Sequence, residues 1–406
     1  GDLQPALVLA ADSARVRAYL RGGEVVELQG GALKFAARML DEKAPANKRV
    51  RRGAVIRLTK DGKQGWQIVQ IPEVEAALIA ASPKDGAVRA LVGGFDFGRN
   101  KFNHVTQAWR QPGSSFKPFI YSAALEKGYN PASVIPDEPI SISAEETGSQ
   151  AWEPKNYDGK YEGPMTLRTG LAKSKNMVSI RLLRSIGTHY AQDYAMRFGF
   201  DADKHPPYLT LALGAGSVTP WQQLAAYAVF ANGGYKIEPY VVKEITDAKG
   251  NVLAAAKPVW AGEESLRVID PRNAYLIDSM MHDVVRRGTA TRANVLKRND
   301  LAGKTGTTND YVDAWFCGYQ PTVVAIAWIG FDQPKRLGNG ETGGAAALPM
   351  WIGYMQQALK GVPESSMERP SGLTPITTSD GGTQDYIYQE HLPLVDTFPT
   401  PINVPP

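Results

Sequence analysis

Ser114 and Lys117 are the residues whose types and spacing most clearly predict chemistry in this sequence. They begin and end the segment Ser114-Ser115-Phe116-Lys117. Residues three apart on a helix share one face, so the serine hydroxyl and the lysine amine can approach each other. Pro118 follows, and a helix tolerates proline only in its first turn, so the helix must begin close to Ser114. The segment therefore predicts a serine nucleophile, beside an amine base, at the positive end of a helix.

A second candidate is the segment Ser174-Lys175-Asn176, a polar interruption between two helical patterns, residues 167–172 and 177–186. Such an interruption predicts a loop. A loop there can present the hydroxyl of Ser174 and the amide of Asn176 to a cleft. The same residues alone would serve equally well as a helix cap or turn.

A third candidate is Lys304-Thr305-Gly306, which Thr307 and Thr308 continue. The pattern of residues 301–308 predicts a strand. A cation beside hydroxyls is suited to a carboxylate, and Gly306 would let a bound chain approach the strand closely. Alone, the run would also fit an ordinary strand edge.

Each of these three patterns occurs once, and their order is typical of penicillin-binding proteins and class A β-lactamases. The sequence resembles a class A penicillin-binding protein, and among those the 1a type of Gram-negative bacteria. Further segments carry the resemblance over most of residues 74–360, namely Arg110-Gln111-Pro112-Gly113-Ser114, Pro154-Lys155-Asn156-Tyr157-Asp158, Gly214-Ala215-Gly216-Ser217-Val218-Thr219-Pro220 and Gly288-Thr289-Ala290. The leading residues resemble, less specifically, the oligonucleotide/oligosaccharide-binding (OB)-like module of 1a-type members.

The resemblance implies a peptidoglycan DD-transpeptidase that cross-links stem peptides and is acylated by β-lactam antibiotics. Ser114 would attack the carbonyl between two terminal D-alanines, and an amine of a neighbouring strand would capture the acyl-enzyme. Lys117 would be the base, Ser174 would relay a proton to the leaving nitrogen, and Asn176 would hold the substrate amide. Burial and the neighbouring cation Lys304 would lower the pKa of Lys117, as a lysine base requires.

The same resemblance implies a binding strand and an oxyanion hole. The terminal carboxylate, or a β-lactam that presents the same group, would be bound by one run of residues: Lys304, Thr305, Gly306, Thr307 and Thr308. The backbone amides of Ser114 and Thr307 would form the oxyanion hole. Trp152 and Tyr157 could line the cleft or pack within a loop, and loop packing is the favoured expectation.

The elements that must position these residues follow from apolar periodicity. Two strands joined by a turn at residues 83–86 come first, helical periodicity then dominates from Ser114 to about Met281, and three strands and a helix follow, over residues 301–308, 313–318, 323–331 and 346–359. The predicted fold class is α+β: a five-stranded antiparallel sheet flanked by helices, with a helical lobe and an active site between the lobes. The resemblance implies the same transpeptidase fold, shared by penicillin-binding proteins and serine β-lactamases.

Three regions are expected along the chain. Residues 1–72 show short β patterns separated by turns, which predict a small barrel, OB-like by resemblance. Residues 73–361 form the transpeptidase domain, and residues 362–406, rich in Pro, Thr, Ser and Gly, predict an extended or poorly ordered tail. Two roles are equally expected for the barrel: it docks an activator protein, or it acts only as a spacer.

Three other functions stay open. A class A β-lactamase uses the same serine and lysine but adds a dedicated glutamate, and the acidic residues between Asn176 and Lys304 do not show its Glu-x-x-Asn pattern. A carboxypeptidase would use water in place of the acceptor amine. A β-lactam sensor would keep the same residues but join them to a signalling domain, which these 406 residues do not show.

Composition gives little support to other classes of function. A net charge of +4 over 406 residues gives no reason to expect nucleic acid as a partner. The five histidines are widely separated and lack metal-ligand spacing, so neither a metal nor another cofactor is expected. Cys317 lies in an apolar run and predicts a buried structural thiol.

The sequence contains no run of about 18 apolar residues, so it predicts no membrane span within these residues. By resemblance, a membrane anchor and a glycosyltransferase domain precede this region in class A members, and neither is visible in residues 1–406. The chain is therefore expected to be part of a longer protein that is anchored in the inner membrane and acts on its periplasmic face.

Overall fold

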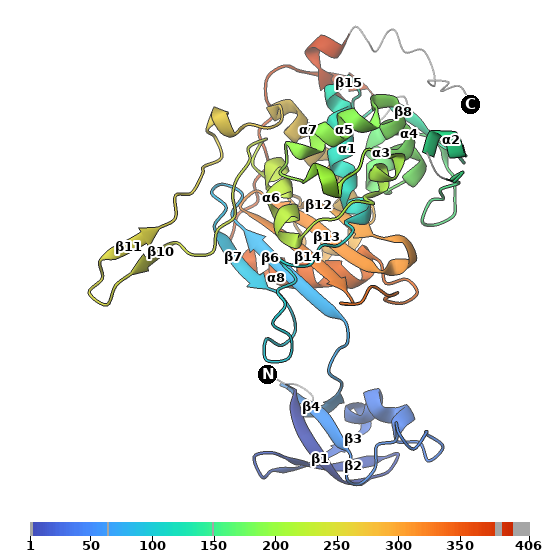
Figure 1. The fold of residues 1–406 in the computed structure, drawn as a ribbon, viewed down its shortest axis with the longest axis vertical. Coiled ribbons are helices and arrows are strands. Elements are labelled where there is room, and N and C mark those ends of the chain that lie inside the picture. The colour runs from blue at the N-terminus through green and yellow to red at the C-terminus, as the bar shows by residue number, and fades with distance from the viewer. Residues whose placement is uncertain (1–2, 63–64, 148–149, 378–383, 393–406) are drawn as a thin grey trace. The chain divides into compact units, whose positions relative to one another are not determined.

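The computed structural model describes residues 3–62, 65–147, 150–377 and 384–392. The chain divides into two compact units, Gly1–Glu73 and Val74–Pro406 (Figure 1). Each unit has its own hydrophobic core.

The N-terminal unit is built on one antiparallel sheet of five strands: β1 (Gln4–Ala11), β2 (Arg15–Leu20), β3 (Val25–Gln29), β4 (Val55–Asp61) and β5 (Gly65–Val69). Their order is β3-β2-β1-β4-β5, and β3 and β5 at the two edges also contact each other. Buried and exposed residues alternate strictly along β2, as expected when one face of a sheet covers a core. The sheet is thus nearly closed, and the predicted OB-like barrel is confirmed.

The second unit is built around another five-stranded antiparallel sheet: β6 (Glu75–Ala81), β7 (Val88–Val92), β12 (Ala302–Thr307), β13 (Asp313–Gln320) and β14 (Val323–Gly330). The order is β12-β13-β14-β6-β7, so β12, which carries the third candidate segment, is an edge strand. All eight residues of β13 are buried. Such continuous burial arises because helices cover both faces of the sheet.

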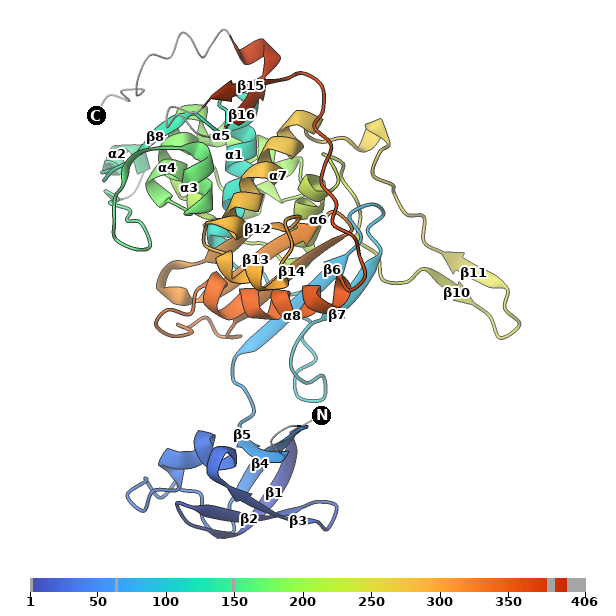
Figure 2. The same ribbon diagram turned by 180° about the vertical axis from the view of Figure 1, so that it is seen from behind.

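Helices α6 (Pro220–Ala231) and α7 (Pro271–Arg286) pack on one face of this sheet, and α8 (Leu348–Ala358) packs on the other. Figure 2, seen from behind, shows α8 in front of the strands. The helix starts follow local rules: Thr219 caps α6 with a capping box, and Asp270 caps α7, each directly before a proline in the first turn. The predicted sheet flanked by helices is confirmed.

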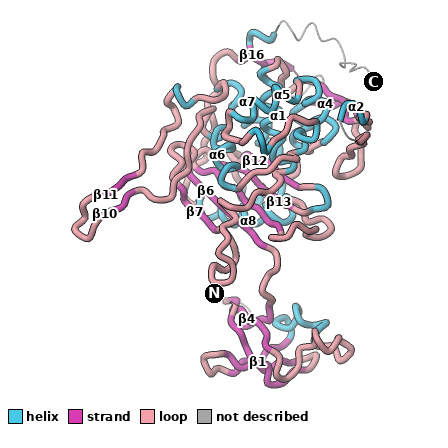
Figure 3. The backbone as a smooth tube through the Cα atoms, viewed as in Figure 1, coloured by secondary structure: helices cyan, strands magenta, loops and turns pink. Residues whose placement is uncertain are grey.

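The helical lobe gathers around α1 (Lys117–Glu126), in which every residue from Lys117 to Leu125 is buried. It contains α2 (Ala144–Thr147), α3 (Leu167–Ala172), α4 (Asn176–Ile186), α5 (Thr188–Met196) and the short paired strands β8 (Val134–Asp137) and β9 (Gly163–Thr166). Figure 3 shows these helices grouped above the strands of the central sheet. Since α1 is buried on all sides, the lobe holds its N-terminal end in a fixed place.

The structure differs from the sequence-based expectation at a β-hairpin within the predicted helical stretch. Strands β10 (Glu244–Thr246) and β11 (Val252–Ala255) pair with each other, and all of their residues are exposed. The hairpin projects away from the rest of its unit (Figure 1). Its turn is closed by Asp247, whose carboxylate accepts hydrogen bonds from two backbone N–H groups and the side chain of Asn251. These local bonds favour a turn over a helix.

The structure also differs from expectation at residues 373–388, within the predicted tail. Strands β15 (Leu373–Thr377) and β16 (Gln384–Tyr388) form an antiparallel hairpin. Asp385 is fully buried and accepts two hydrogen bonds from the Arg168 guanidinium, at 2.7 and 2.8 Å. This ion pair joins the hairpin to α3, a contact that the composition of the segment does not reveal. The predicted tail residues 378–383 and 393–406 lie outside the described residues.

Two further sequence-based expectations concern single features. Cys317 is fully buried within β13, so the predicted buried thiol is confirmed. Within residues 3–62, 65–147, 150–377 and 384–392, no helix has both the length and the apolar character of a membrane span.

Candidate active site

Ser114 lies in a tight 3-10 turn, Gly113–Phe116, that leads directly into α1. The turn is pressed against β12. A Cβ atom on Gly113, whose φ is +55°, would lie 2.6 Å from the carbonyl oxygen of Thr307. A Cβ atom on Gly306 would lie 2.5 Å from the carbonyl oxygen of Pro112. Only glycine permits such approaches of two backbones, so these two glycines join the first candidate segment to the third.

Lys117, one helical turn beyond Ser114, is fully buried and points toward the second segment. Its amine lies 2.7 Å from the Ser174 carbonyl oxygen, 2.8 Å from Asn176 Oδ1 and 3.3 Å from Ser174 Oγ. Burial, and then the charge of Lys304, hold the pKa of Lys117 well below its ordinary value. These contacts link the first segment to the second.

Ser174 occupies the loop between α3 and α4, in a left-handed conformation with φ +57°. Its hydroxyl accepts a hydrogen bond from the Lys304 amine at 2.7 Å, and Lys304 also donates to the Thr305 carbonyl oxygen at 3.1 Å. Lys304 is fully buried, which lowers its pKa to about 7. The Ser174 hydroxyl therefore lies between two amines from different elements.

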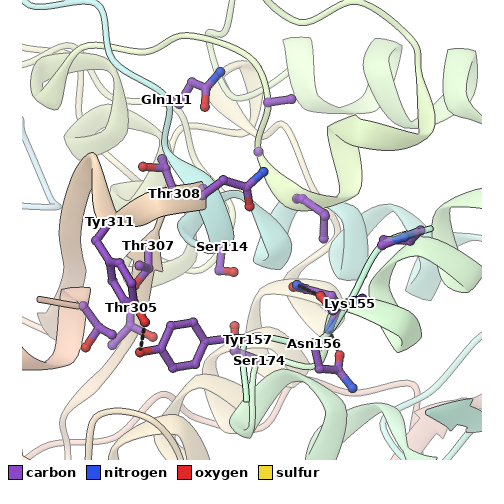
Figure 4. A pocket seen from close by; sticks show the side chains of 18 of the residues that line it. Gln111, Ser114, Lys155, Asn156, Tyr157, Ser174, Thr305, Thr307, Thr308 and Tyr311 are labelled. Atoms are coloured by element: carbon purple, nitrogen blue, oxygen red, sulfur yellow. Dashed lines mark hydrogen bonds between the residues drawn. The ribbon is translucent and has the colours of Figure 1, made fainter. Parts of the chain in front are cut away.

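Ser114, Ser174 and Asn176 border an open groove of about 860 Å³. Ser114 lines it at the start of α1, with Thr305 and Thr307 on one side and Ser174 and Asn156 nearby (Figure 4). The part of the chain that the structure describes thus brings all three candidate segments to one place. Lys117 and Lys304 lie behind the groove wall and meet at Ser174.

The comparisons with known proteins agree with this geometry. Residues 76–349 match the sequence model of the penicillin binding protein transpeptidase domain, and residues 1–74 match that of the penicillin-binding protein OB-like domain. The chain belongs to the penicillin-binding protein family. The resemblance drawn from the three segments is thereby confirmed.

Relatives of this penicillin-binding protein include penicillin-binding protein 1A of Neisseria lactamica, 49% identical over 96% of this chain and 48% of the relative. Penicillin-binding protein 1A of Pseudomonas aeruginosa is 40% identical over 100% of this chain and 56% of the relative. The chain spans about half the length of the curated relatives that it matches.

Solved structures give the same family. Penicillin-binding protein 1A from Haemophilus influenzae superposes with a TM-score of 0.87 at 36% identity, covering 95% of this chain and 62% of that one. The penicillin-binding protein PonA1 from Mycobacterium tuberculosis, in complex with penicillin V, gives a TM-score of 0.63 at 27% identity, covering 74% of this chain and 82% of that one.

The threonines of the third segment in this penicillin-binding protein have different hydrogen-bond partners. Thr305 and Thr307 line the groove, and their hydroxyls contact Thr289 Oγ1 at 2.6 Å and the backbone N–H of Gly343 at 3.0 Å. Thr308 also lines the groove, but its hydroxyl accepts the backbone N–H of Asp313 at 2.9 Å. The hydroxyls of these three threonines are therefore each held by a neighbouring group.

The expected approach of a bound chain at Gly306 stays a prediction, and the structure shows which groups already lie beside this residue. A Cβ atom on Gly306 would lie 2.5 Å from the Pro112 carbonyl oxygen and 2.9 Å from Trp315 Cβ. Gly306 therefore permits the close approach of the Ser114 turn to β12. Thr305, Thr307 and Thr308 are the members of the strand that face the groove.

The favoured expectation that Trp152 and Tyr157 pack within a loop is wrong, since both residues line the groove. Tyr157 is 62% exposed. Its hydroxyl lies 2.9 Å from that of Tyr311, which belongs to the turn between β12 and β13 (Figure 4). This contact joins the two walls of the groove, and residues 154 positions apart give no sequence signal for it.

Asn156 and Asp137 are further residues that sequence reasoning missed. Asn156 lines the groove wall and accepts the backbone N–H of Asn176 at 2.8 Å, while it donates to Asp137 at 2.6 Å. Asn156 was noted only within a segment that resembles the family, and nothing in its spacing links it to Asn176. Among the described residues, no group of His, Cys, Asp and Glu side chains is arranged to hold a metal ion.

Proposed function

We propose that this chain is the transpeptidase portion of a peptidoglycan cross-linking enzyme of the serine type, specific for D-Ala-D-Ala termini. One observation carries the proposal: the Ser174 hydroxyl lies within hydrogen-bond distance of both Lys117 and Lys304, beside a groove that Ser114 lines. A nucleophile, a buried amine and a proton relay are the parts that an acyl-transfer reaction needs.

In the proposed acylation, Lys117 removes the Ser114 proton while Ser114 Oγ attacks the carbonyl carbon of the penultimate residue. A neutral amine carries two hydrogens and one lone pair. The Ser174 carbonyl oxygen and Asn176 Oδ1 accept the two hydrogens, which leaves the lone pair for the Ser114 proton. The lowered pKa of Lys117 supports this role, because it makes the neutral amine accessible at moderate pH.

The bond between carbonyl carbon and nitrogen then breaks. We propose that the Ser174 hydroxyl gives its proton to the leaving nitrogen. The hydroxyl then regains a proton from the protonated Lys117 amine 3.3 Å away. D-Alanine leaves as a neutral amine, and Ser114 keeps the acyl group as an ester. An amine of a second stem peptide attacks this ester, and the reverse proton transfers restore the Ser114 hydroxyl.

Ligand binding is assigned to the opposite wall of the groove. Thr305 and Thr307, with the cation of Lys304 behind them, would hold the terminal carboxylate or that of a β-lactam. The backbone amides of Ser114 and Thr307 would form the oxyanion hole, a role supported by the close approach of their two segments. Asn176 Nδ2 donates one hydrogen to the Lys155 carbonyl oxygen, and the other would contact the substrate amide.

Other properties of the whole protein are proposed by analogy with its longer relatives. The full-length protein would be anchored in the inner membrane and act on its periplasmic face. The OB-like unit would receive an activator protein. These proposals rest on the family alone and are tested separately from the chemistry of the groove.

The test is incubation of the chain with a labelled penicillin and with a D-Ala-D-Ala peptide. A label that stays bound for many minutes, together with release of D-alanine that an added acceptor amine diverts into a cross-linked product, supports a transpeptidase. Release of the label within seconds would mean a β-lactamase. Hydrolysis of the peptide without any amine product would mean a carboxypeptidase.

A further inference from the structure

Asp137 is a buried carboxylate outside the groove to which the proposed reaction gives no role. It ends β8 and is 0% exposed. Its Oδ1 accepts a hydrogen bond from Asn156 Nδ2 at 2.6 Å, and its Oδ2 accepts the backbone N–H of Glu162 at 3.0 Å. The amine of Lys175 lies 3.3 Å from Oδ2. Both oxygens therefore hold groups that belong to the loops around Ser174.

Asn156 carries this contact to the second motif. Its Oδ1 accepts the backbone N–H groups of Asn176 and Met177, at 2.8 and 3.3 Å. These are among the first N–H groups of α4, which have no partner inside the helix. Asn176 Oδ1 in turn accepts the Lys117 amine at 2.8 Å. Hydrogen bonds thus run without a break from Asp137 through Asn156 and Asn176 to Lys117.

Lys175 supplies a second connection. It lies between Ser174 and Asn176 in sequence, but its side chain is only 3% exposed and points toward Asp137. Its amine also lies 3.0 Å from Glu162 and 3.3 Å from Asp158. Burial opposes its charge, but the bond to Glu162 and the charge of Asp137 outweigh burial and raise the pKa of Lys175. The charged side chain of Lys175 therefore anchors the Ser174-Asn176 loop to these three carboxylates.

We propose that Asp137 is a positioning residue for acylation, which acts through Asn156 and Lys175 to hold the Ser174-Asn176 loop against Lys117. The inference deepens the proposed function of the groove and rests on it. This series of hydrogen bonds fixes the direction in which Asn176 Oδ1 and the Ser174 carbonyl oxygen face the Lys117 amine. Reaction rates fall steeply when reacting groups shift by about 1 Å. This series of hydrogen bonds therefore controls the acylation rate.

A purely structural carboxylate would behave differently from a positioning one. The charge of Asp137 favours the protonated form of Lys117, against the larger opposing effects of burial and of Lys304. Removing that charge lowers the pKa of Lys117, so the rising part of the acylation profile moves to lower pH. Besides Lys117 and Lys175, the titratable groups that the charge of Asp137 affects are those of Tyr121 and Arg181.

The experiment measures the second-order rate of acylation by a labelled penicillin, per active site, between about pH 5 and 9. For Asp137→Asn we expect a rate about 10- to 100-fold lower and a rising limb at lower pH. The matched control is Asp385→Asn, which changes another carboxylate that is 0% exposed and holds a buried cation, Arg168. The control is expected to lower stability without moving the pH profile.

A double substitution tests the bond itself. In Asp137→Asn with Asn156→Asp, the amide and the carboxylate exchange places, so the new Nδ2 donates to the new carboxylate, which still accepts the N–H groups of α4. We expect the pair to recover part of the rate lost in either single variant. Recovery is partial because Asn156 also donates to the Lys160 carbonyl oxygen, which a carboxylate cannot do.

The outcomes separate this inference from the function on which it rests. If wild-type chain is not acylated at Ser114, the proposed function fails. If wild type is acylated but Asp137→Asn keeps its rate and pH profile, the positioning role is overturned and the function stands. If Asp137→Asn does not fold, Asn156→Ser is measured instead, and an unchanged rate there overturns the role equally.

Discussion

Gly113→Ala separates the packing of the nucleophile turn from the chemistry of its side chains. The new Cβ would lie 2.6 Å from the Thr307 carbonyl oxygen and 2.8 Å from its carbon. Ordinary contact begins near 3.4 Å, so the turn and β12 must separate by about 0.8 Å, since neither obstacle is a flexible side chain. A displacement of about 1 Å at reacting groups costs about 100-fold in rate, and we therefore expect acylation to fall by about that factor.

Gly113 also has a φ of +55°, which costs an alanine about 1 to 2 kcal/mol. Gly187→Ala controls for this cost, because Gly187 has a φ of +91° but no atom of the part of the chain that the structure describes within 4 Å of its Cβ position. Both variants should unfold at lower temperature, while only Gly113→Ala should lose acylation by labelled penicillin. A Gly113→Ala rate within about threefold of wild type, in folded protein, would refute the claim that this approach sets the site.

Three further predictions concern ionisable groups. Acylation should rise with pH through the lowered pKa of Lys117, since the base must be neutral, and a flat rate between about pH 5 and 9 would contradict a lysine base. His205 is buried, neither of its ring nitrogens has a hydrogen-bond partner among the described residues, and burial lowers its pKa to about 4. Stability should therefore fall as pH drops from about 6.5 to 4, by about 3 kcal/mol in the limit, and thermal melts of His205→Phe should show a smaller loss. Asp385→Ala leaves the Arg168 guanidinium buried without this partner and should cost about 3 to 5 kcal/mol in denaturant unfolding, whereas an unchanged midpoint would mean that the β15-β16 hairpin does not hold the domain together.

The features that the sequence predicted are those encoded by neighbouring residues. Pro118 requires a helix start, and the continuous apolar runs of β13 and β14 predict strands that are covered on both faces. Three short segments with fixed internal spacing then point to a common site, because their residue types fit serine acyl transfer and their order fits penicillin-binding proteins and class A β-lactamases. Local pattern and chemistry together were sufficient for the sheet, the lobe and the groove.

The features that the sequence did not predict depend on contacts between distant residues. Asp137 has no neighbour in sequence that marks it as buried, since Asn156 lies 19 positions away and Lys175 lies further still. The contact of Tyr157 with Tyr311 requires both walls of the groove to be in place. The packing of Gly306 against Pro112 could not be predicted for the same reason, because Pro112 comes from another segment of the chain.

The most direct test of the account is to locate the acylated residue. The chain is incubated with a labelled penicillin, digested and mapped by mass spectrometry, with Ser114→Ala and the adjacent Ser115→Ala as paired variants. Label on the peptide that contains residue 114, lost in Ser114→Ala and kept in folded Ser115→Ala, is the predicted result. Label on any other residue, or stable labelling that survives in Ser114→Ala, would contradict the account.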